Sequence, residues 1–309
     1  MEATKQWLST EDIRIRDPFI LTAVTDEHSF YYMYGTTDDN PWAGPGAGFD
    51  AYRSRDLRHW EGPFPVFRVA TGSGSNASFW GKENFWAPEV HRLDGQYYML
   101  ASFKAPGYCR GTQLLAANHP LGPFQPLTNE PLTPPDWECL DGTLYQDDEG
   151  QRWIVFCREW LEVVDGEMYA RRLKPDMTGT LGEPYRLFSA SEAPWTILQG
   201  NDTHQGYVTD GPFLFSPRSG ELWMIWSSYG EEGYAMGLAR SQSGGILGPW
   251  KQENEPFFRK DGGHGMLFRT WEGQLALTLH CPNDTPRERA QFHSISIEQD
   301  RFIIERRHL

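Results

Sequence analysis

Acidic side chains recur where short apolar segments of this chain begin. Asp17, Glu89, Asp141 and Asp210 each stand in a Pro- or Gly-containing segment that leads into apolar residues, and His264 holds the corresponding place in a fifth segment. Clustered carboxylates disfavour one another's ionisation, so one of them keeps its proton near neutral pH. An ionised carboxylate can then activate water while a protonated one donates to a leaving oxygen, as glycoside hydrolysis requires.

A turn role is the alternative for each of these residues taken singly, because Asp before Pro or Gly is common in turns. Their recurrence in a repeat favours a shared function. The strands that would position these residues are indicated by the rest of the sequence.

A degenerate hairpin repeats five times along the chain. A polar turn rich in Asp, Glu and Gly is followed by an aromatic and aliphatic strand at 26–34, 94–100, 148–156, 219–226 and 272–279. A second module, an alternating strand that ends at Gly-Pro plus an aromatic residue, follows at 48–64, 111–124 and 236–250. Two strands plus two strands make a four-stranded antiparallel sheet.

The composition agrees with sheets rather than helices. Aromatic residues make up 14 % of the 309 positions, and 31 Gly and 22 Pro would interrupt most helices. We therefore predict an all-β fold, a five-bladed β-propeller of four-stranded antiparallel blades, formed by residues 1–309 as a single domain. A β-sandwich with irregular hairpins is the alternative. In a propeller the first strand of each blade lines the axis, so the five segments above would converge on one pocket.

The charge balance excludes some partners. The formal net charge of −14 argues against nucleic acid, because phosphate binding needs a basic surface. No apolar run is long enough to span a bilayer, and residues 1–7 lack the apolar core of a signal peptide, so we expect a cytoplasmic protein without a membrane partner. The four cysteines are far apart in the sequence, which favours buried reduced thiols over a zinc site or disulfides.

Several of these segments together resemble glycoside hydrolase family 43. The resemblance rests on Arg16-Asp17-Pro18-Phe19-Ile20, Cys139-Leu140-Asp141 with the turn 147–150, Asp210-Gly211-Pro212-Phe213 and Gly263-His264-Gly265, in the family's order along the whole chain. It implies a five-bladed propeller of inverting arabinofuranosidases, xylosidases and arabinanases. It also implies that Asp17 is the general base and that Asp141 raises the pKa of the acid and orients it.

The general acid departs from the family pattern. The family usually has Glu-Gly-Pro or Glu-Ala-Pro at the start of blade four, whereas this chain has Asp210-Gly211-Pro212. Glu192-Ala193-Pro194 lies 18 residues upstream and offers the expected tripeptide, though no inner strand follows it directly. Asp210 and Glu192 therefore both remain candidates, and both carboxyl groups could enter the pocket.

His264 matches the axial histidine of the family, which often contacts a bound calcium or a water cluster. A structural calcium ion on the axis is thus a candidate, although calcium prefers oxygen ligands and the histidine could instead bond backbone carbonyls. We expect that the chemistry itself requires no cofactor.

Aromatic residues beside the carboxylates are candidates for a sugar subsite, because flat rings stack on the apolar faces of sugars. These substrate-binding candidates are Trp42, Phe85, Trp86 and Trp195, with blade packing as the alternative role. Glu89 also points toward the expected pocket. Arg158 and Glu159 are candidates for bonding sugar hydroxyls, with a solvated ion pair as the alternative.

The predicted function is hydrolysis of terminal pentosyl units, of the α-L-arabinofuranosidase or β-D-xylosidase type, from small plant-derived oligosaccharides with inversion. Two alternatives stay open. Trp137-Glu138-Cys139 resembles the acid-bearing motif of the retaining fructosidases of glycoside hydrolase family 32. A propeller that binds carbohydrate without hydrolysis is the other, because the blade-four Glu is missing. The sequence does not indicate an oligomeric state.

Overall fold

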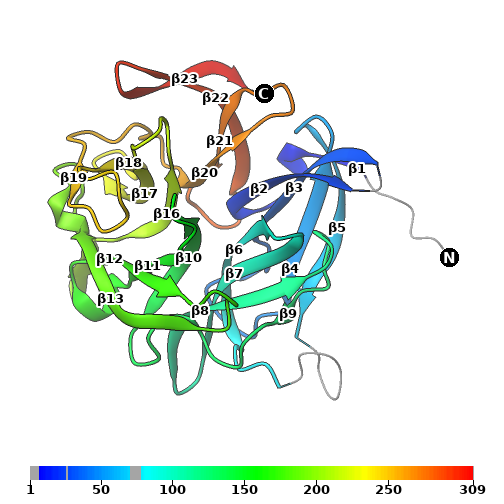
Figure 1. Cartoon of the computed structure of the whole chain (residues 1–309), viewed down its shortest axis with the longest axis horizontal. Helices are drawn as coiled ribbons and strands as arrows, with labels where there is room; N and C mark the ends of the chain where they lie inside the picture. Colours follow the sequence, from blue (N-terminus) through cyan, green and yellow to red (C-terminus); the bar gives the residue numbers. More distant parts are fainter. Residues whose placement is uncertain (1–6, 26, 70–77, 309) are drawn as a thin grey trace.

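The computed structural model describes residues 7–25, 27–69 and 78–308, and its five main sheets surround a central axis (Figure 1). The predicted all-β, five-bladed propeller is confirmed, since each of the five hairpin repeats lies in its own antiparallel sheet. Most of residues 1–7, on which the expectation of no signal peptide rests, lie outside the described residues.

Each blade is built from consecutive strands, and the innermost strands are β2, β6, β10, β16 and β20 (Figure 1). Blade one has the order β1-β5-β4-β3-β2, and blades two to five have the orders β6-β7-β8-β9, β10-β11-β12-β13, β16-β17-β18-β19 and β20-β21-β22-β23. The strands of blades one and two are β1 (Trp7–Ser9), β2 (Arg16–Thr25), β3 (His28–Thr36), β4 (Gly48–Ser54), β5 (His59–Arg68), β6 (Glu83–Leu93), β7 (Gln96–Ala105), β8 (Tyr108–Ala117) and β9 (Gln125–Pro126). Those of blades three to five are β10 (Cys139–Gln146), β11 (Arg152–Arg158), β12 (Glu167–Leu173), β13 (Thr180–Ser189), β16 (Asp210–Phe215), β17 (Trp223–Gly230), β18 (Gly233–Ser241), β19 (Trp250–Gln252), β20 (Gly263–Arg269), β21 (Leu275–Cys281), β22 (Arg289–Glu298) and β23 (Arg301–His308).

A few elements depart from the four-stranded repeat. β1 adds a fifth strand to the outer edge of blade one, where it pairs with β5. A two-stranded sheet of β14 (Gln199–Asn201) and β15 (His204–Gly206) lies between blades three and four. The helical elements in the described ranges are short: α1 (Trp160–Val163), η1 (Thr10–Asp12) and η2 (Ala190–Glu192). Within those ranges, no helix is long and apolar enough to cross a membrane.

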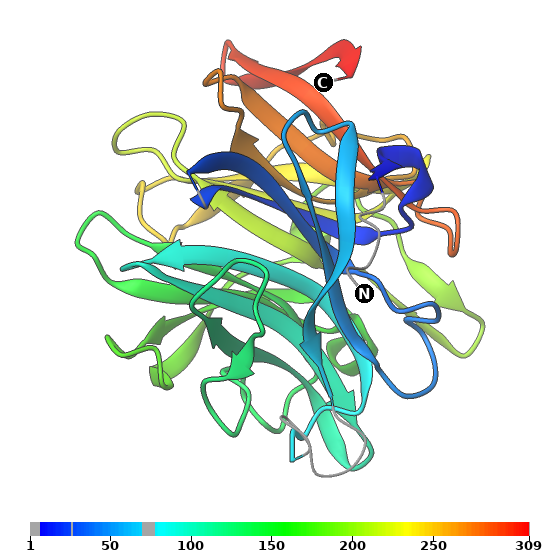
Figure 2. The same ribbon diagram turned by 90° about the vertical axis from the view of Figure 1, so that its right-hand side faces the viewer.

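The ring closes between the first and last blades. Figure 2 shows blade one between blade five and blade two. β2 contacts both β20 and β6, and Arg14 forms an isolated bridge with Arg289. The buried Arg16 guanidinium meets Glu288 at 3.0 Å, so an ion pair joins the first and last blades beside the axis.

Aromatic side chains fill the space between and within the blades. Trp60, Trp226 and Tyr34 are fully buried, as expected of a chain whose strands are rich in rings. The four cysteines are free in the structure; Cys139 and Cys157 are buried, whereas Cys109 and Cys281 are partly exposed. These packed blades hold the innermost strands in fixed positions around the axis.

Candidate active site

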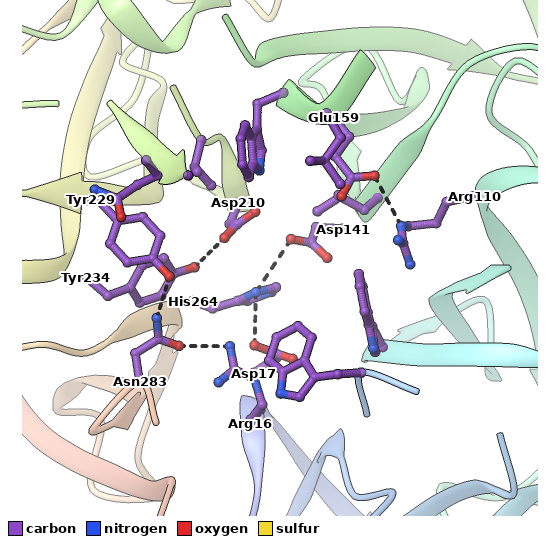
Figure 3. A pocket seen from close by; sticks show the side chains of 18 residues that line it. Arg16, Asp17, Arg110, Asp141, Glu159, Asp210, Tyr229, Tyr234, His264 and Asn283 are labelled. Carbon is purple, nitrogen blue, oxygen red and sulfur yellow. Dashed lines mark hydrogen bonds and ion pairs between the residues drawn. The ribbon is translucent and has the colours of Figure 1, made fainter. Parts of the chain in front are cut away.

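A pocket of about 400 Å³ opens on the propeller axis (Figure 3). It contains three of the four candidate catalytic carboxyls, Asp17, Asp141 and Asp210, together with His264. The other residues that line it are Arg16, Trp42, Trp86, Arg110, Leu140, Glu159, Trp160, Leu161, Gln199, Gly200, Val208, Tyr229, Tyr234 and Asn283. The structure therefore brings together carboxyls that are about 190 residues apart in the sequence.

A β-bulge near the start of each innermost strand orients side chains toward the pocket. In every blade the register between the first two strands shifts near the start of the innermost strand. At each shift one residue adopts a left-handed backbone, with φ of 53° at Asp17, 46° at Ala87, 55° at Asp141, 50° at Gly211 and 46° at His264. A bulge of this kind turns the side chain away from the ordinary alternation of the strand.

This register corrects the expected equivalence of the carboxylates. Asp17, Asp141 and His264 do occupy equivalent left-handed positions, but Asp210 stands one residue earlier, where it pairs with Ser227 as Arg16 pairs with Thr36. In blade two the equivalent residue is Ala87, and Glu89 lies two residues beyond it. The sequence carries the same offset, because Pro18 and Pro212 each follow the left-handed residue and so align Asp210 with Arg16.

Asp17 lies in surroundings that favour its ionised form. Its Oδ2 accepts a hydrogen bond of 2.7 Å from the Thr36 hydroxyl, and its Oδ1 lies 3.2 Å from His264 Nδ1. Burial alone would raise the pKa of Asp17, but the charges of His264 and Arg16 outweigh burial, so this pKa lies below its ordinary value. Asp17 is therefore suited to accept a proton.

The surroundings of Asp141 and Asp210 instead raise the pKa of each carboxyl group. Burial and the nearby charge of Asp17 raise the pKa of Asp141 well above its usual range. Burial and the charge of Asp141 raise the pKa of Asp210 to about 7, although the Tyr234 hydroxyl donates to Asp210 Oδ2 at 2.9 Å. The pocket therefore holds a carboxylate, Asp17, beside two coupled carboxyl groups whose pKa values are raised, and the pKa of about 7 leaves Asp210 partly protonated near neutral pH.

A buried hydrogen-bond network holds the Asp17 backbone. The Asp17 N–H donates to His280 Nδ1 at 3.1 Å, so the ring proton must sit on Nε2, which donates to Asn283 Oδ1 at 3.1 Å. Burial and the Arg16 charge lower the pKa of His280 to about 3, in keeping with a neutral ring. Asn283 Oδ1 also accepts from Arg16 at 2.8 Å, and its amide donates to Tyr229 at 3.0 Å.

Two tryptophans and a buried ion pair form the wall beside Asp17. The rings of Trp42 and Trp86 lie 5.4 Å apart edge to face, and the Trp86 indole carries the Arg110 guanidinium 3.8 Å above its centroid. Arg110 meets Glu159 at 3.4 Å, and both side chains are nine-tenths buried. Glu159, for which a solvated ion pair was the alternative, is thus part of a buried pair at the pocket.

Four other candidates lie outside the pocket lining. Phe85 packs in the hydrophobic core against Phe103 at 4.8 Å between ring centroids, and Trp195 packs against Trp226 at 5.2 Å. Arg158 pairs with Glu162 over the ring of Trp137. Glu89 pairs with His91 at 3.2 Å. Phe85 and Trp195 therefore take the packing role that was their alternative. Phe85 precedes Trp86 in β6, and adjacent strand residues face opposite sides, whereas Trp195 lies in the turn after η2.

The structure does not bring Glu192 to the axis, which corrects the expectation that it shares the pocket with Asp210. Glu192 ends the short helix η2, where its carboxylate accepts the Ser189 N–H at 2.9 Å and lies 3.3 Å from Arg186. Its side chain is 46 % exposed. Glu192 forms a capping box with Ser189 in the segment that follows β13, so the tripeptide Glu192-Ala193-Pro194 ends a short helix and does not begin an inner strand.

His264 is placed between two carboxyls rather than in a cage of oxygen ligands. Its Nδ1 lies 3.2 Å from Asp17 Oδ1 and 3.6 Å from Asp141 Oδ2. Within residues 7–25, 27–69 and 78–308 there is no group of three His, Cys, Asp or Glu side chains arranged to hold a metal ion. This donor set does not fit a directly ligated calcium, which takes six to eight oxygens.

The sequence reasoning missed several residues of the pocket. Arg110 and Tyr234 lie near the starts of β8 and β18, and Asn283 lies in a loop after β21. None of them has a motif that marks it. Arg16 belongs to the segment Arg16–Ile20, and its position directly before Asp17 is the sequence signal that could have marked it as a pocket residue.

The chain is similar to known proteins in both sequence and structure. The model of Glycosyl hydrolases family 43 matches residues 12–298. An endo-arabinase from Bacteroides thetaiotaomicron VPI-5482 has a similar structure, with a TM-score of 0.85 at 41 % identity over 96 % of this chain and 99 % of that one. The extracellular exo-alpha-(1->5)-L-arabinofuranosidase ArbA of Cellvibrio japonicus is 22 % identical over 88 % of this chain and 80 % of its own. An alpha-L-arabinofuranosidase from Lactobacillus brevis shares the fold, with a TM-score of 0.70 at 18 % identity over 95 % of this chain and 96 % of that one.

Proposed function

Since this chain belongs to glycosyl hydrolases family 43 and is a glycoside hydrolase, we propose that it releases terminal α-L-arabinofuranosyl units from arabino-oligosaccharides with inversion. The arabinose specificity is supported by the names of two relatives, the endo-arabinase at 41 % identity and the exo-arabinofuranosidase ArbA. A β-D-xyloside is the other pentoside to test.

The placement of Asp17 and Asp210 in one pocket, with pKa values shifted in opposite directions, carries this proposal. Asp17, with its lowered pKa, accepts a proton from the water that attacks the anomeric carbon. Asp210, with a pKa of about 7, donates its proton to the oxygen that leaves with the rest of the oligosaccharide. Asp141 lies beside the acid, and its charge helps to keep that proton in place.

The walls of the pocket supply the contacts that a pentose needs. Trp42 and Trp86 offer ring faces to the apolar side of a sugar, and Arg110 and Glu159 offer polar atoms to its hydroxyls. Trp86 also donates from its indole nitrogen to Pro41 O, which holds the loop that carries Trp42 against blade two.

Release of single terminal units is supported by two structures at the pocket edge. The Trp42 indole donates to Thr285 Oγ1 at 2.9 Å, so the loop between β3 and β4 meets the loop after β21 on one side. On another side α1 contacts β15, and residues of α1 and β14 line the pocket. Such walls favour a pocket that takes a chain end over a groove that takes an internal segment.

The two alternative functions are not retained. The retaining alternative needs Glu138 as an acid, but Glu138 pairs with Lys104 at 2.9 Å and does not line the pocket, and the chain belongs to family 43. Membership of a family of hydrolases likewise overturns the propeller that only binds carbohydrate.

The test is hydrolysis of arabinotriose, followed by separation of the products and by NMR of the first anomer released. We expect arabinose and arabinobiose as the first products, and the inverted anomer. The Asp17→Asn variant should lose at least about 1000-fold in kcat, while Asp148→Asn, an exposed turn residue of the same type, should match the wild type. A retained anomer, or full activity of Asp17→Asn, would refute the mechanism.

A further inference from the structure

The backbone N–H groups of the left-handed residues at the axis make a recurring kind of hydrogen bond. In four blades this N–H donates to a buried side chain on the second strand of the preceding blade. The bonds run from Ala87 to Thr36 Oγ1 at 2.8 Å, from Asp141 to Ser102 Oγ at 2.9 Å, from His264 to Ser227 Oγ at 2.8 Å and from Asp17 to His280 Nδ1 at 3.1 Å. All four acceptors pair with the residue directly before the left-handed residue of their own blade.

Blade three lacks such an acceptor. The equivalent position, the partner of Leu140, holds Cys157, whose thiol is fully buried and contacts Met168 Sδ at 3.9 Å. Sulfur is a weak hydrogen-bond acceptor. The N–H of Gly211, the left-handed residue of blade four, instead donates to Asp141 Oδ2 at 3.1 Å.

Blade one shows what a hydroxyl does at this position. Thr36 accepts the Ala87 N–H and donates its own proton to Asp17 Oδ2 at 2.7 Å, so a hydroxyl stands between the carboxylate and the next blade. In blade three no hydroxyl intervenes, and Asp141 bonds the next blade directly. Because Gly211 follows Asp210, this bond ties Asp141 to the backbone that carries the candidate acid.

We propose that Cys157 is a positioning residue for proton donation. Because its thiol is not a strong acceptor, the Gly211 N–H donates to Asp141 instead. This bond fixes the position of the neighbouring acid, Asp210. This inference rests on the proposed function of Asp210. The acid is then held at two points, through its carboxyl by Tyr234 and through the following amide by Asp141. Cys157 touches neither substrate nor reacting atoms and acts through Asp141 and Gly211.

The Cys157→Ser variant tests the inference, because it supplies the hydroxyl that the other blades have. The new hydroxyl should accept the Gly211 N–H, which releases Asp141 and lets Asp210 shift from its donating position. For arabinobiose, whose leaving sugar needs a proton, we expect kcat to fall about 10-fold with KM unchanged. For the 2,4-dinitrophenyl arabinofuranoside, whose leaving group needs no proton, kcat should stay within about 2-fold of the wild type.

The matched control is Cys157→Ala, which also lacks an acceptor and should keep the bond between Gly211 and Asp141. Its thermal stability should fall because a buried side chain is truncated, but the ratio of its rates on the two glycosides should equal that of the wild type. A purely structural role for Cys157 predicts instead that both variants slow both glycosides alike. That result, or a wild-type ratio for Cys157→Ser, would overturn the inference.

A second measurement does not depend on turnover. In glycine-labelled protein the Gly211 amide proton should resonate downfield in the wild type and in Cys157→Ala, because it bonds a carboxyl group. In Cys157→Ser and in Asp141→Asn it should move upfield. An unchanged Gly211 resonance in Cys157→Ser overturns the inference whatever the enzyme cleaves, whereas a wild type that cleaves neither arabinoside refutes the proposed function alone.

Discussion

The hydroxyl of Tyr234 sets how readily the candidate acid loses its proton. This hydroxyl donates to Asp210 Oδ2 at 2.9 Å, and such a bond favours the ionised carboxylate. The Tyr234→Phe variant removes the donor and keeps the ring, which stacks 5.7 Å from His280. The pKa of Asp210 should therefore rise.

The size of the rise follows from the strength of the bond. A hydrogen bond to a charged group contributes about 1.5–3 kcal/mol, and one pKa unit corresponds to about 1.4 kcal/mol. Because a protonated Asp210 also bonds Tyr234, only part of this energy is lost on titration, and we expect a rise of about 1 unit. The wild-type pKa of Asp210 is about 7.

The sign of the effect on activity is set by the role of Asp210. A general acid must be protonated, so activity is lost as pH rises through its pKa. In Tyr234→Phe the alkaline limb of kcat/KM on arabinobiose should move upward by about 1 pH unit. Tyr229→Phe is the control, because Tyr229 bonds Asn283 and not Asp210. A downward shift, or an equal shift in both variants, would refute the assignment of Asp210 as the acid.

Three further outcomes are expected. Glu192→Gln should keep the wild-type kcat, because Glu192 lies outside the pocket. Glu159→Gln should raise KM for arabinobiose, because it breaks the buried pair with Arg110 at the pocket. Equal effects of the two variants in steady-state kinetics would contradict the placement of Glu159 at the pocket and of Glu192 outside it. Glu288→Ala leaves the Arg16 charge without its ion-pair partner and should cost about 3–5 kcal/mol in urea unfolding, and a loss within the range of a surface pair, about 1 kcal/mol or less, would contradict a buried pair. Dialysis against a chelator should leave kcat unchanged, since the described pocket residues form no direct metal cage; loss of activity restored by calcium would show that an ion is needed.

Much of the fold could be predicted because its signals are local. Each polar turn and aromatic strand is a short stretch whose pattern is set by the residues themselves, and five copies require five blades. The axial position of Asp17, Asp141 and Asp210 followed from that repeat. The offset of Asp210 is also present in the sequence, since the proline after each bulge aligns Asp210-Gly211-Pro212 with Arg16-Asp17-Pro18, but a comparison of the acidic residues alone hides it.

The role of individual side chains depended on contacts that no local pattern contains. Glu192 has the tripeptide expected of the acid, but it caps a short helix outside the pocket, while Phe85 and Trp195 pack in the core. Arg110 and Tyr234 entered the site only through the positions of neighbouring strands and blades.

The sequence by itself determined the repeat, the all-β class and the acidic residues from which a catalytic pair could be chosen. The tertiary structure alone decided which carboxyls share the pocket and which of them keeps a proton. The physical reason is that a pKa near a cluster depends on burial and on charges a few ångströms away, and those neighbours come from different blades. Asp17 and Asp210 are both aspartates, and only their surroundings suit one to accept a proton and the other to donate it.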